Sequence, residues 1–377
     1  MNKPVKVVQM TTVHHPEDPR IYHKQCRSLA EAGFEVTYIA PYVKGLTLDE
    51  PNLTYMPLPA VKRRFLSMMI SPIRAYRMVK KLGADIIHLH DPELLLVGNL
   101  LSSKGYHVVY DIHEDYQTGI VTRDYFNKPV RKGLSAIYKW IEKRATKGMT
   151  LVLAEKYYKD LYPSGIPLLN YPILDESLRN LPVPQGPREK KVLYTGNITR
   201  DRGALTHAGL VHTDADLEVH MIGKCDPVLA KAMRALAVPS ESRLLIEGEG
   251  SFVSRGRIIE GYASRPWLAG LALFPPSEHY EKKELTKFFE YMLAGIPIIC
   301  SDFPVWRTFV ERYGCGVTVD PDDPAAIREV IADLHANPEF VEQMGKCGKA
   351  AVTNELNWSK EAEKLVALYE SLMSGEK

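Results

Sequence analysis

The segment from Lys287 to Ile299, KFFEYMLAGIPII, restricts most strongly what this chain can fold into. Phe288, Tyr291 and Met292 recur at helical spacing, which predicts an amphipathic helix with these side chains in a core. Gly295 predicts the end of the helix, because glycine readily adopts the left-handed conformation found there. The apolar residues around the following proline are typical of a buried parallel strand. We therefore expect a helix that leads directly into a central strand of an α/β sheet.

One residue of this segment, Glu290, does not fit the apolar pattern. It is either a carboxylate on the solvated edge of the helix or a carboxylate that accepts hydrogen bonds from ligand hydroxyls. Lys287 lies one helical turn earlier, close enough in sequence to pair with Glu290 or to reach a phosphate.

The chain is long enough for two domains of ordinary size, because it has 377 residues. Its charge is uneven: residues 1–180 carry a net charge of +7 and the remainder carries −5. The proline-rich, charged stretch 180–191 is interpreted as a linker. We therefore predict an N-terminal domain over residues 1–180 and a C-terminal domain over residues 181–356.

The first domain opens with two strand patterns, 5–10 and 33–40, separated by a helical pattern over 21–32. This order predicts a parallel sheet, in which ligands bind at the carboxyl ends of the strands. The first such end is a long polar loop that contains His14, Asp18 and Arg20. The loop is either part of a binding site or is folded by an Asp18–Arg20 pair.

Two later strands, within 85–93 and 108–116, also end in polar side chains. Three explanations are open: a metal site, acid–base groups beside a bound ligand, or buried histidines with satisfied hydrogen bonds. The last is favoured for His88, which lies inside its strand. The residues predicted to meet at this edge with His14 are His90, Asp91, His113 and Glu114.

The second domain opens with a strand at 191–196 and a glycine-flanked turn. Glycine lets the backbone approach a phosphate, and the start of the next helix offers free N–H groups. Two arginines add positive charge suited to bidentate phosphate contacts. The predicted phosphate-binding residues of this turn are Gly196, Asn197, Arg200, Arg202 and Gly203.

Two basic stretches, 61–81 and 123–147, interleave cations with apolar and aromatic residues. Each is either a solvated helix face or a surface for an anionic membrane leaflet, and the occurrence of two favours peripheral membrane contact. No nucleic-acid motif is present, and the near-neutral total charge argues against that partner. Five scattered cysteines and the absence of a long apolar run predict a cytoplasmic protein, at most attached to the inner face of the membrane.

Four of these segments resemble motifs of the family 4 glycosyltransferases. Lys287 begins a K-x-x-E-Y-M-x-x-G-x-P pattern, and 196–203 matches a G-N-x-x-x-x-R-G diphosphate loop. Residues 88–94 and 110–115 match H-x-H-D-P-E-L and Y-D-x-H-E-D. The resemblance spans nearly the whole chain, but Lys282 stands where the family usually has a second glutamate.

The resemblance implies an α/β protein of the GT-B fold, with two Rossmann-like, doubly wound parallel-sheet domains that face a central cleft. It implies a C-terminal helix over residues 357–377 that crosses back to the N-terminal domain. In the family the glutamate matched by Glu290 contacts the donor ribose. His113 matches a histidine near the donor sugar and the acceptor hydroxyl. The fold generally works without a divalent metal, so no cofactor or metal is expected.

The implied activity is a retaining, hexosyltransferase-like transfer from a nucleotide-diphosphate sugar, UDP- or GDP-linked, to a glycan or lipid-linked acceptor in surface polysaccharide synthesis. His113 and Glu290 are the expected catalytic residues, and the turn together with Lys287 and Glu290 is expected to bind the donor. Two alternatives stay open: a nucleotide-sugar epimerase or hydrolase of the same fold, or a non-catalytic nucleotide-sugar-binding scaffold, which the Lys282 substitution keeps open.

Overall fold

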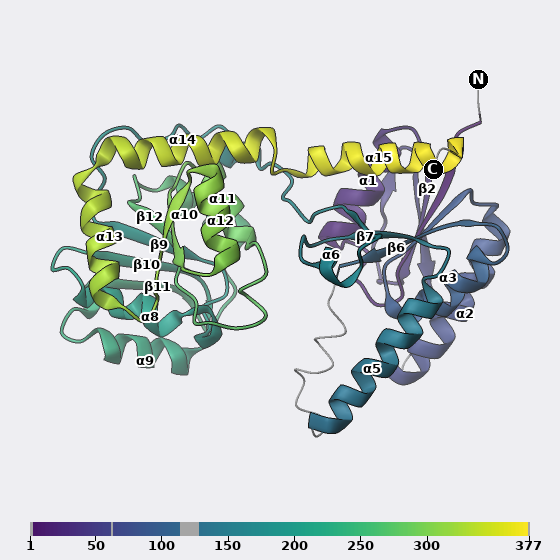
Figure 1. Cartoon of the computed structure of the whole chain (residues 1–377), viewed down its shortest axis with the longest axis horizontal. Coiled ribbons are helices and arrows are strands. Elements are labelled where there is room, and N and C mark those ends of the chain that lie inside the picture. Colours follow the sequence, from purple (N-terminus) through teal and green to yellow (C-terminus); the bar gives the residue numbers. More distant parts are fainter. Residues whose placement is uncertain (1–2, 62, 114–127, 376–377) are drawn as a thin grey trace. The chain divides into compact units, whose positions relative to one another are not determined.

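The computed structural model describes residues 3–61, 63–113 and 128–375, which divide into two compact units. The first unit comprises Met1–Asn170 together with Trp358–Lys377, and the second comprises Tyr171–Asn357 (Figure 1). Each unit contains its own sheet with helices packed against it.

The first unit is built on an eight-stranded sheet with the order β3-β4-β2-β1-β5-β6-β7-β8. All neighbouring strands run parallel except β3 and β4. The strand β1 lies between β2 and β5, as the opening strand of a doubly wound sheet should. The strands are β1 (Lys6–Met10), β2 (Glu35–Pro41), β3 (Asp49–Glu50), β4 (Leu53–Leu58), β5 (Ile86–Leu89), β6 (His107–Ile112), β7 (Thr150–Leu153) and β8 (Ile166–Pro167).

Helices cover both faces of this sheet because its strands alternate between two hydrophobic cores. Val7 packs with α1 and the C-terminal helix α15, whereas Val8 packs with α2 and α3. A helical segment, Pro19–Cys26, precedes α1, and short helical turns occupy Pro92–Leu94 and Tyr158–Leu161 (α6). The principal helices are α1 (Arg27–Glu31), α2 (Arg64–Leu82), α3 (Leu95–Ser102), α5 (Lys128–Ala145) and α15 (Trp358–Ser374).

The C-terminal helix α15 is part of the first unit, although the whole second unit precedes it in the chain (Figure 1). Leu365 and Tyr369 are fully buried there, and the Trp358 indole donates a hydrogen bond to Ser28 Oγ at 2.9 Å. The buried Glu361 carboxylate accepts a hydrogen bond from the Leu169 backbone N–H at 2.9 Å. The end of the chain thus completes one of the two cores of the first unit.

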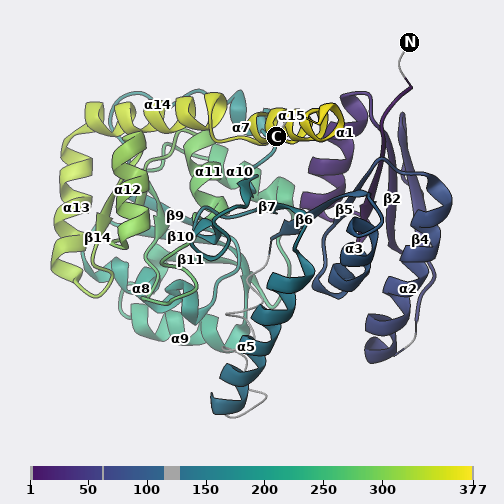
Figure 2. The ribbon, with the colours of Figure 1, turned by 45° about the vertical axis from the view of Figure 1, so that its right-hand side comes forward.

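The second unit is built on a six-stranded parallel sheet with the order β11-β10-β9-β12-β13-β14. Its strands are β9 (Lys191–Thr195), β10 (Glu218–Cys225), β11 (Leu244–Glu249), β12 (Ala269–Ala272), β13 (Ile298–Ser301) and β14 (Gly316–Val319). Its helices are α7 (Glu176–Arg179), α8 (Ala204–Gly209), α9 (Pro227–Ala237), α10 (Arg255–Ala263), α11 (Thr286–Leu293), α12 (Pro304–Tyr313), α13 (Pro324–Ala336) and α14 (Pro338–Asn354) (Figure 2).

The helix-to-strand prediction for Lys287–Ile299 is confirmed by α11 and β13. Phe288, Tyr291 and Met292 are each fully buried, as their spacing predicts. Gly295 follows the helix with a φ of +70°, the left-handed conformation that glycine adopts without a steric penalty.

The boundary between the units falls ten residues earlier than predicted, because the segment after Asn170 packs on the second unit. The ring of Tyr171 lies 5.2 Å from the ring of Phe289, and Leu178 is fully buried. Arg188 is also buried and donates to the Trp267 carbonyl oxygen at 2.8 Å. The stretch interpreted as a linker is therefore a packed part of the second unit.

After β11 the chain turns at Gly248–Gly250, and residues 258–260 then lie in helix α10. Ser254 caps this helix, with its Oγ accepting from the Arg257 N–H at 3.3 Å. The glycines do end β11, with φ of +99° at Gly248 and +68° at Gly250, but the chain then continues as a helix.

A prediction concerns the buried Tyr369 hydroxyl, which lies 2.7 Å from His88 Nδ1 and accepts from Gln9 Nε2 at 3.2 Å. Tyr369→Phe removes the hydroxyl and leaves buried polar atoms without their partner. We expect a loss of about 1–2 kcal/mol in the free energy of unfolding, measured by urea unfolding. Tyr42→Phe, at a side chain 53% exposed, is the control and should change stability by less than about 0.5 kcal/mol. Equal losses of stability in the two variants would contradict a stabilising role for the hydrogen bonds of the Tyr369 hydroxyl.

Candidate functional site

The polar strand ends of the first unit meet because β1, β5 and β6 are parallel neighbours in register. Met10 pairs with Leu89, and Leu89 pairs with Tyr110. The loops that follow these residues therefore leave the sheet at one edge. His14, Asp91 and His113 lie together at this edge, as predicted.

The centre of this cluster is Asp111, which is fully buried at the end of β6. Its carboxylate accepts two hydrogen bonds from the Arg20 guanidinium, at 2.8 and 2.7 Å, and one from Gln25 Nε2 at 2.9 Å. Burial alone raises the pKa of Asp111, but the Arg20 charge and the hydrogen bonds from His90 and Arg20 outweigh it. The pKa of Asp111 therefore lies well below its ordinary value, and the carboxylate is ionised.

The two histidines of β5 and its end are buried and hydrogen-bonded. His90 Nε2 lies 2.6 Å from Gln9 Oε1, and its Nδ1 lies 3.2 Å from Asp111 Oδ2. The His88 ring stacks on His90 with centroids 4.6 Å apart. Burial, followed by the neighbouring His90, lowers the pKa of His88 well below its ordinary value. These contacts support the explanation of a satisfied buried histidine for His90, whereas His88 is hydrogen-bonded through Nδ1 and its buried Nε2 has no partner among the described residues.

Ligand atoms of His88, His90 and Asp111 lie within 4.8 Å of one another, so the metal explanation can be tested against geometry. Both carboxylate oxygens of Asp111 already accept from the Arg20 guanidinium. A metal ion here would face that permanent positive charge and would have to displace it. The donor set does not suit a cation, and we assign no metal to it.

His14 and His113 are hydrogen-bonded to each other nearer the surface, with the carboxylates of Asp91 and Asp18 close by. The Nε2 atoms of His14 and His113 are 3.0 Å apart. His14 Nε2 also lies 3.3 Å from Asp91 Oδ1, and His14 Nδ1 lies 3.6 Å from Asp18 Oδ2. Asp91 is fully buried, whereas the side chains of His14 and Asp18 keep 18% and 23% of their surface exposed.

The Asp18–Arg20 side-chain pair considered for the first loop does not form. Asp18 instead caps the following helical segment, with Oδ1 accepting from the N–H groups of Arg20 and Ile21 at 2.9 Å. The Arg20 side chain is 5% exposed and pairs with Asp111. Its place in the site is therefore to orient Asp111. Glu114, predicted for the same edge, lies outside the described residues.

The predicted phosphate turn of the second unit follows β9. Gly196 and Gly203 have φ of +95° and +73°, and a Cβ on Gly203 would collide with the Leu273 carbonyl oxygen. Asn197 and Arg200 are exposed, whereas Arg202 is half-buried and donates from Nε to the Tyr280 hydroxyl at 3.2 Å. The helix after the turn, α8, has only six residues. The fixed charge of Arg202 is thus the main anion-attracting feature of the turn itself.

Lys287 lies beside this turn and is fully enclosed. Its Nζ sits 3.5 Å from the centre of the Tyr194 ring and 5.0 Å from that of Phe274, and it has no hydrogen-bond partner among the described residues. Burial, with a further contribution from the Arg202 charge, lowers the pKa of Lys287 well below its ordinary value. The pairing with Glu290 does not occur, and the ammonium group has no acceptor of its own.

Glu290 is hydrogen-bonded to Tyr262 and paired with Arg255, two contacts that the sequence did not predict. Its Oε2 accepts from the Tyr262 hydroxyl at 2.6 Å, and Oε1 pairs with Arg255. Arg255 also lies 3.7 Å from Asp175 Oδ2. The Glu290 side chain is 18% exposed, so it is neither buried in the core nor on the open solvated edge.

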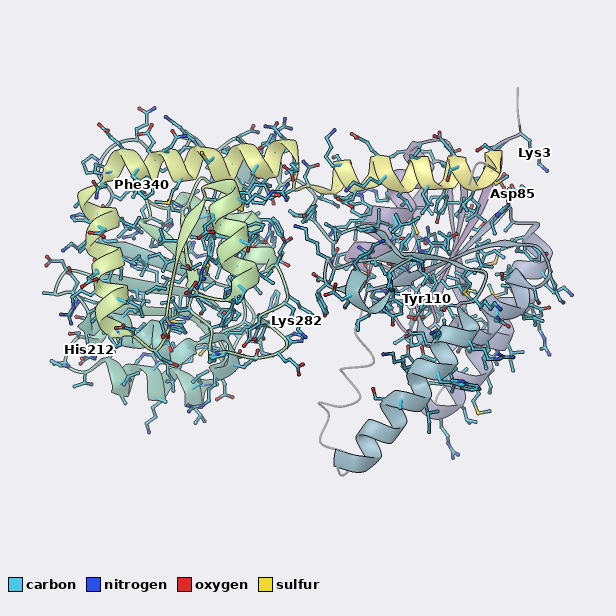
Figure 3. The ribbon with its side chains drawn as sticks, viewed as in Figure 1. Lys3, Asp85, Tyr110, His212, Lys282 and Phe340 are labelled. Carbon is cyan, nitrogen blue, oxygen red and sulfur yellow. The ribbon has the colours of Figure 1, made fainter. Side chains whose placement is uncertain are left out.

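Lys282, at the position of the family's other glutamate, lies on the surface of the second unit (Figure 3). Its side chain is 53% exposed, and Nζ lies 3.8 Å from Glu278 Oε1. It is therefore not enclosed with Lys287 and Glu290.

Sequence reasoning missed several residues that hold these side chains, chiefly Asp111 and Gln9 in the first unit and Arg255 and Tyr262 in the second. Asp111 and Gln9 had a detectable signal, since each is a polar residue inside an otherwise apolar strand. Arg255 and Tyr262 had none, because their segment was not recognised as a helix.

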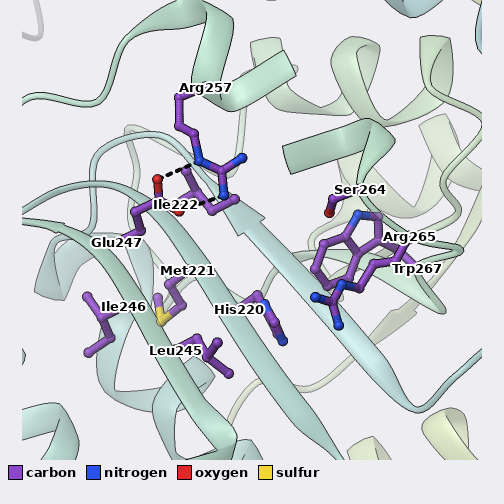
Figure 4. Close-up of a pocket in the computed structure, with 10 residues that line it drawn as sticks. All are labelled: His220, Met221, Ile222, Leu245, Ile246, Glu247, Arg257, Ser264, Arg265 and Trp267. Atoms are coloured by element: carbon purple, nitrogen blue, oxygen red, sulfur yellow. Dashed lines mark hydrogen bonds and ion pairs between the residues drawn. The ribbon is translucent and has the colours of Figure 1, made fainter. Parts of the chain in front are cut away.

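A cavity of about 260 Å³ lies elsewhere in the second unit, between β10, β11 and α10 (Figure 4). Two of the charged side chains that line it pair with each other: the Arg257 guanidinium donates to the two carboxylate oxygens of Glu247 at 2.7 and 2.9 Å. None of the predicted site residues lines it, and we assign no ligand to it.

Two family models match separate parts of this chain. The Glycosyltransferase Family 4 model matches residues 20–155, and the Glycosyl transferases group 1 model matches residues 286–351. A search of the curated proteins found no match. The first match includes Asp111 and His113, and the second includes Lys287 and Glu290.

Solved structures share the fold at low sequence identity. Sucrose-phosphate synthase from Thermosynechococcus elongatus is 15% identical with a TM-score of 0.69, covering 99% of this chain and all of that one. Anabaena HepE, solved in complex with UDP, is 11% identical with a TM-score of 0.69, covering 98% and 100%. WaaG, a glycosyltransferase of lipopolysaccharide biosynthesis, is 12% identical with a TM-score of 0.63, covering 96% and 98%. The predicted GT-B, Rossmann-like fold is confirmed, and the family matches support a glycosyltransferase.

A prediction follows from the buried ammonium of Lys287. Its lowered pKa means that the unfolded chain binds more protons than the folded chain between the folded pKa and about 10.4. This residue therefore makes stability rise with pH across that window and costs stability at neutral pH. Lys287→Met should stabilise the protein at pH 7 and flatten this rise, as measured by urea unfolding from pH 6 to 10.

The exposed Lys282→Met is the matched control and should leave both the stability and its pH dependence nearly unchanged. A Lys287→Met protein that is less stable at neutral pH than the parent would contradict the prediction, because the side chain would then have a stabilising partner.

Proposed function

Since the fold and the family matches support a GT-B glycosyltransferase, we propose that this chain transfers a hexose from a nucleotide-diphosphate sugar to a glycan or lipid-linked acceptor. We propose that the configuration at the anomeric carbon is retained and that no metal takes part. The observation that carries the donor assignment is the enclosed Lys287 ammonium, which has no acceptor and lies where the charges of Arg202 and Glu290 both reach it.

The donor diphosphate suits this site because the Arg202 charge, the buried Lys287 amine and a glycine-flanked turn lie together. The bond between the anomeric carbon and the diphosphate oxygen breaks in the reaction, and negative charge grows on the diphosphate. Arg202 and Lys287 stabilise that charge in surroundings from which water is excluded. Lys287 takes up a proton when the anion arrives, since the anion favours the charged form of the side chain.

The donor ribose is assigned to Glu290. A carboxylate accepts hydrogen bonds only, and two vicinal hydroxyls are donors that match its two oxygens. In the structure these oxygens accept from Tyr262 and Arg255, so Glu290 is already oriented before a donor binds. The UDP in the similar Anabaena structure favours a uridine nucleotide over a guanosine nucleotide.

The acceptor is assigned to the first unit, where His113 lies at the end of β6 beside His14. The acceptor hydroxyl forms the new bond to the anomeric carbon and loses its proton. Imidazoles and carboxylates are the groups that hold sugar hydroxyls and accept such protons, and this strand edge presents both.

A membrane-bound acceptor is supported by the helices α2, α3 and α5, which lie side by side on one face of the first sheet (Figure 2). Large apolar side chains are exposed along all three helices: Leu66, Met68, Met69, Ile73, Leu96, Leu100, Ile137, Trp140 and Ile141. Exposed cations accompany them: Arg77, Lys80, Lys81, Lys139, Lys143 and Arg144. Residues 123–127 of the predicted basic stretches lie outside the described part of the chain.

This combination suits the surface of an anionic leaflet, in which the apolar side chains enter the interface and the cations face lipid phosphates. Within the described residues no helix is long and apolar enough to span a bilayer. We propose peripheral contact at the cytoplasmic face, which would bring the first unit to a lipid-linked acceptor of polysaccharide synthesis.

The donor prediction is tested with a panel of nucleotide sugars, by calorimetry for binding and by nucleotide release for turnover. Arg202→Ala and Glu290→Gln should each weaken binding of the preferred donor about 10- to 100-fold, since hydrogen bonds to charged groups are worth about 1.5–3 kcal/mol. Arg328→Ala, an exposed arginine on α13, is the control and should bind normally.

Two outcomes would contradict the transferase. Failure of the folded protein to bind any donor would favour a scaffold with another ligand. Conversion of the sugar without an acceptor would favour an epimerase or hydrolase. Inversion at the anomeric carbon of the product would refute retention alone.

The membrane prediction is tested by sedimentation with vesicles that contain or lack an anionic phospholipid. Because each cation near such a surface contributes about 1 kcal/mol, the double charge reversal Lys80→Glu/Lys81→Glu should reduce binding to anionic vesicles by at least about tenfold. Lys231→Glu, an exposed change on α9 of the second unit, should have little effect. Equal binding to neutral and anionic vesicles would refute the electrostatic part of the proposal.

A further inference from the structure

One polar contact at the edge of the first sheet joins two imidazoles. His14 Nε2 and His113 Nε2 lie 3.0 Å apart, and the ring centroids are 4.8 Å apart. Two bare nitrogen lone pairs at this distance repel each other, and so do two N–H groups. The pair is therefore stable with a single hydrogen between the two nitrogens, donated by one ring and accepted by the other.

Asp91 determines which ring carries that hydrogen. Its Oδ2 accepts from the Thr12 backbone N–H at 2.5 Å and from the Thr11 and Thr12 hydroxyls at 2.9 and 3.2 Å. Its Oδ1 is buried and faces His14 Nε2 at 3.3 Å. A hydrogen on His14 Nε2 is attracted to both this carboxylate and His113, so His14 is the donor.

His113 is fixed by the same arrangement from the other side. Its Nε2 accepts from His14, and its Nδ1 lies 3.3 Å from the Asp111 backbone carbonyl oxygen, which can only accept. His113 is therefore neutral with its hydrogen on Nδ1. Burial lowers the pKa of His113, and the neighbouring groups His90, Arg20 and His14 lower it further. The Asp111 charge raises this pKa but does not outweigh them.

The next proton to reach this group goes to the remaining free nitrogen, His14 Nδ1. That atom lies on the partly exposed side of the ring, 3.6 Å from Asp18 Oδ2. The resulting imidazolium would lie between two carboxylates, Asp91 and Asp18, with His113 as a further acceptor. The nearby cation Arg20 is neutralised by its bidentate pairing with Asp111.

We propose that Asp91, His14 and His113 form a proton relay in which His14 receives the proton released by the acceptor hydroxyl. The proposal rests on the glycosyl transfer proposed above. The acceptor O–H bond breaks and its proton goes to His14 Nδ1, while the acceptor oxygen bonds to the anomeric carbon and the diphosphate leaves with the electron pair of the broken bond. His14 then passes the proton to solvent. Asp91 and His113 are positioning residues, because they act through His14.

The relay is tested first without any donor, by nitrogen NMR of the full chain labelled with ¹⁵N-histidine. The spectra should show His14 with its hydrogen on Nε2 and His113 with its hydrogen on Nδ1. Acidification should add the next proton to the pair at His14 Nδ1. Exposed His335 in the second unit serves as the internal control.

Two variants make this test decisive. Asp91→Asn should lower the pH at which the pair takes up that proton by about one unit or more, because an opposite charge within a few ångströms is removed. His14→Gln, a change at a partly exposed side chain, should raise the pKa of His113 and remove the imidazole hydrogen bond to His113 Nε2. Glu17→Gln, an exposed change in the same loop, should alter neither. Independent titration of the two rings, or no effect of both variants, would overturn the relay.

The same variants then separate the relay from the proposed function. With an active donor, the acidic limb of the pH profile of kcat/KM should shift with Asp91→Asn in the direction and amount seen by NMR. An NMR result as expected without turnover on any donor would leave the coupled pair standing and refute the transferase. Turnover with an unshifted acidic limb would show that the pair does not take the proton, and would overturn the proposal.

Discussion

The buried ion pair between Arg20 and Asp111 is the contact on which the first unit's strand edge depends. Neither charge is exposed to more than 5%, so each would be costly to bury alone. Arg20 comes from the helical segment after β1 and Asp111 from β6, so the pair ties the first loop to the sheet. Once Asp111 is ionised and fixed, its carboxylate is a defined acceptor for His90, and its backbone carbonyl oxygen faces His113 Nδ1.

The two units handle charge in opposite ways. In the described part of the first unit the buried charges Arg20 and Asp111 pair with each other, and the outer members of the network, His14 and Asp18, are partly exposed. In the second unit Lys287 is buried without a partner and Arg202 is only half-buried. Paired charges hold side chains in place for a neutral sugar, whereas a buried amine without an acceptor takes up a proton where an anion binds. This contrast is the physical basis for assigning the donor to one unit and the acceptor to the other.

Local patterns in the sequence predicted much of the fold but fewer of the contacts. The helix and strand around Gly295 could be predicted because periodicity and the helix end lie within thirteen residues. The Arg20–Asp111 pair could not, since 91 residues separate its members and only the folded sheet brings them together. The helix α10 was missed because Gly256 and Gly261 interrupt its apolar pattern. The partners of Glu290, Arg255 and Tyr262, lie in this helix and could therefore not be predicted either.

The packing of α15 has a consequence for how this chain acquires its structure during synthesis. Trp358, Leu365 and Tyr369 complete a core whose other side chains belong to the first 170 residues. Burying each of these side chains stabilises the unit by about 1.5–3 kcal/mol. Domains ordinarily fold in the order of their synthesis. In this chain part of the apolar surface of the first unit stays uncovered until the second unit and α15 have been synthesised. The second unit, whose sequence is continuous, can therefore finish folding before the first.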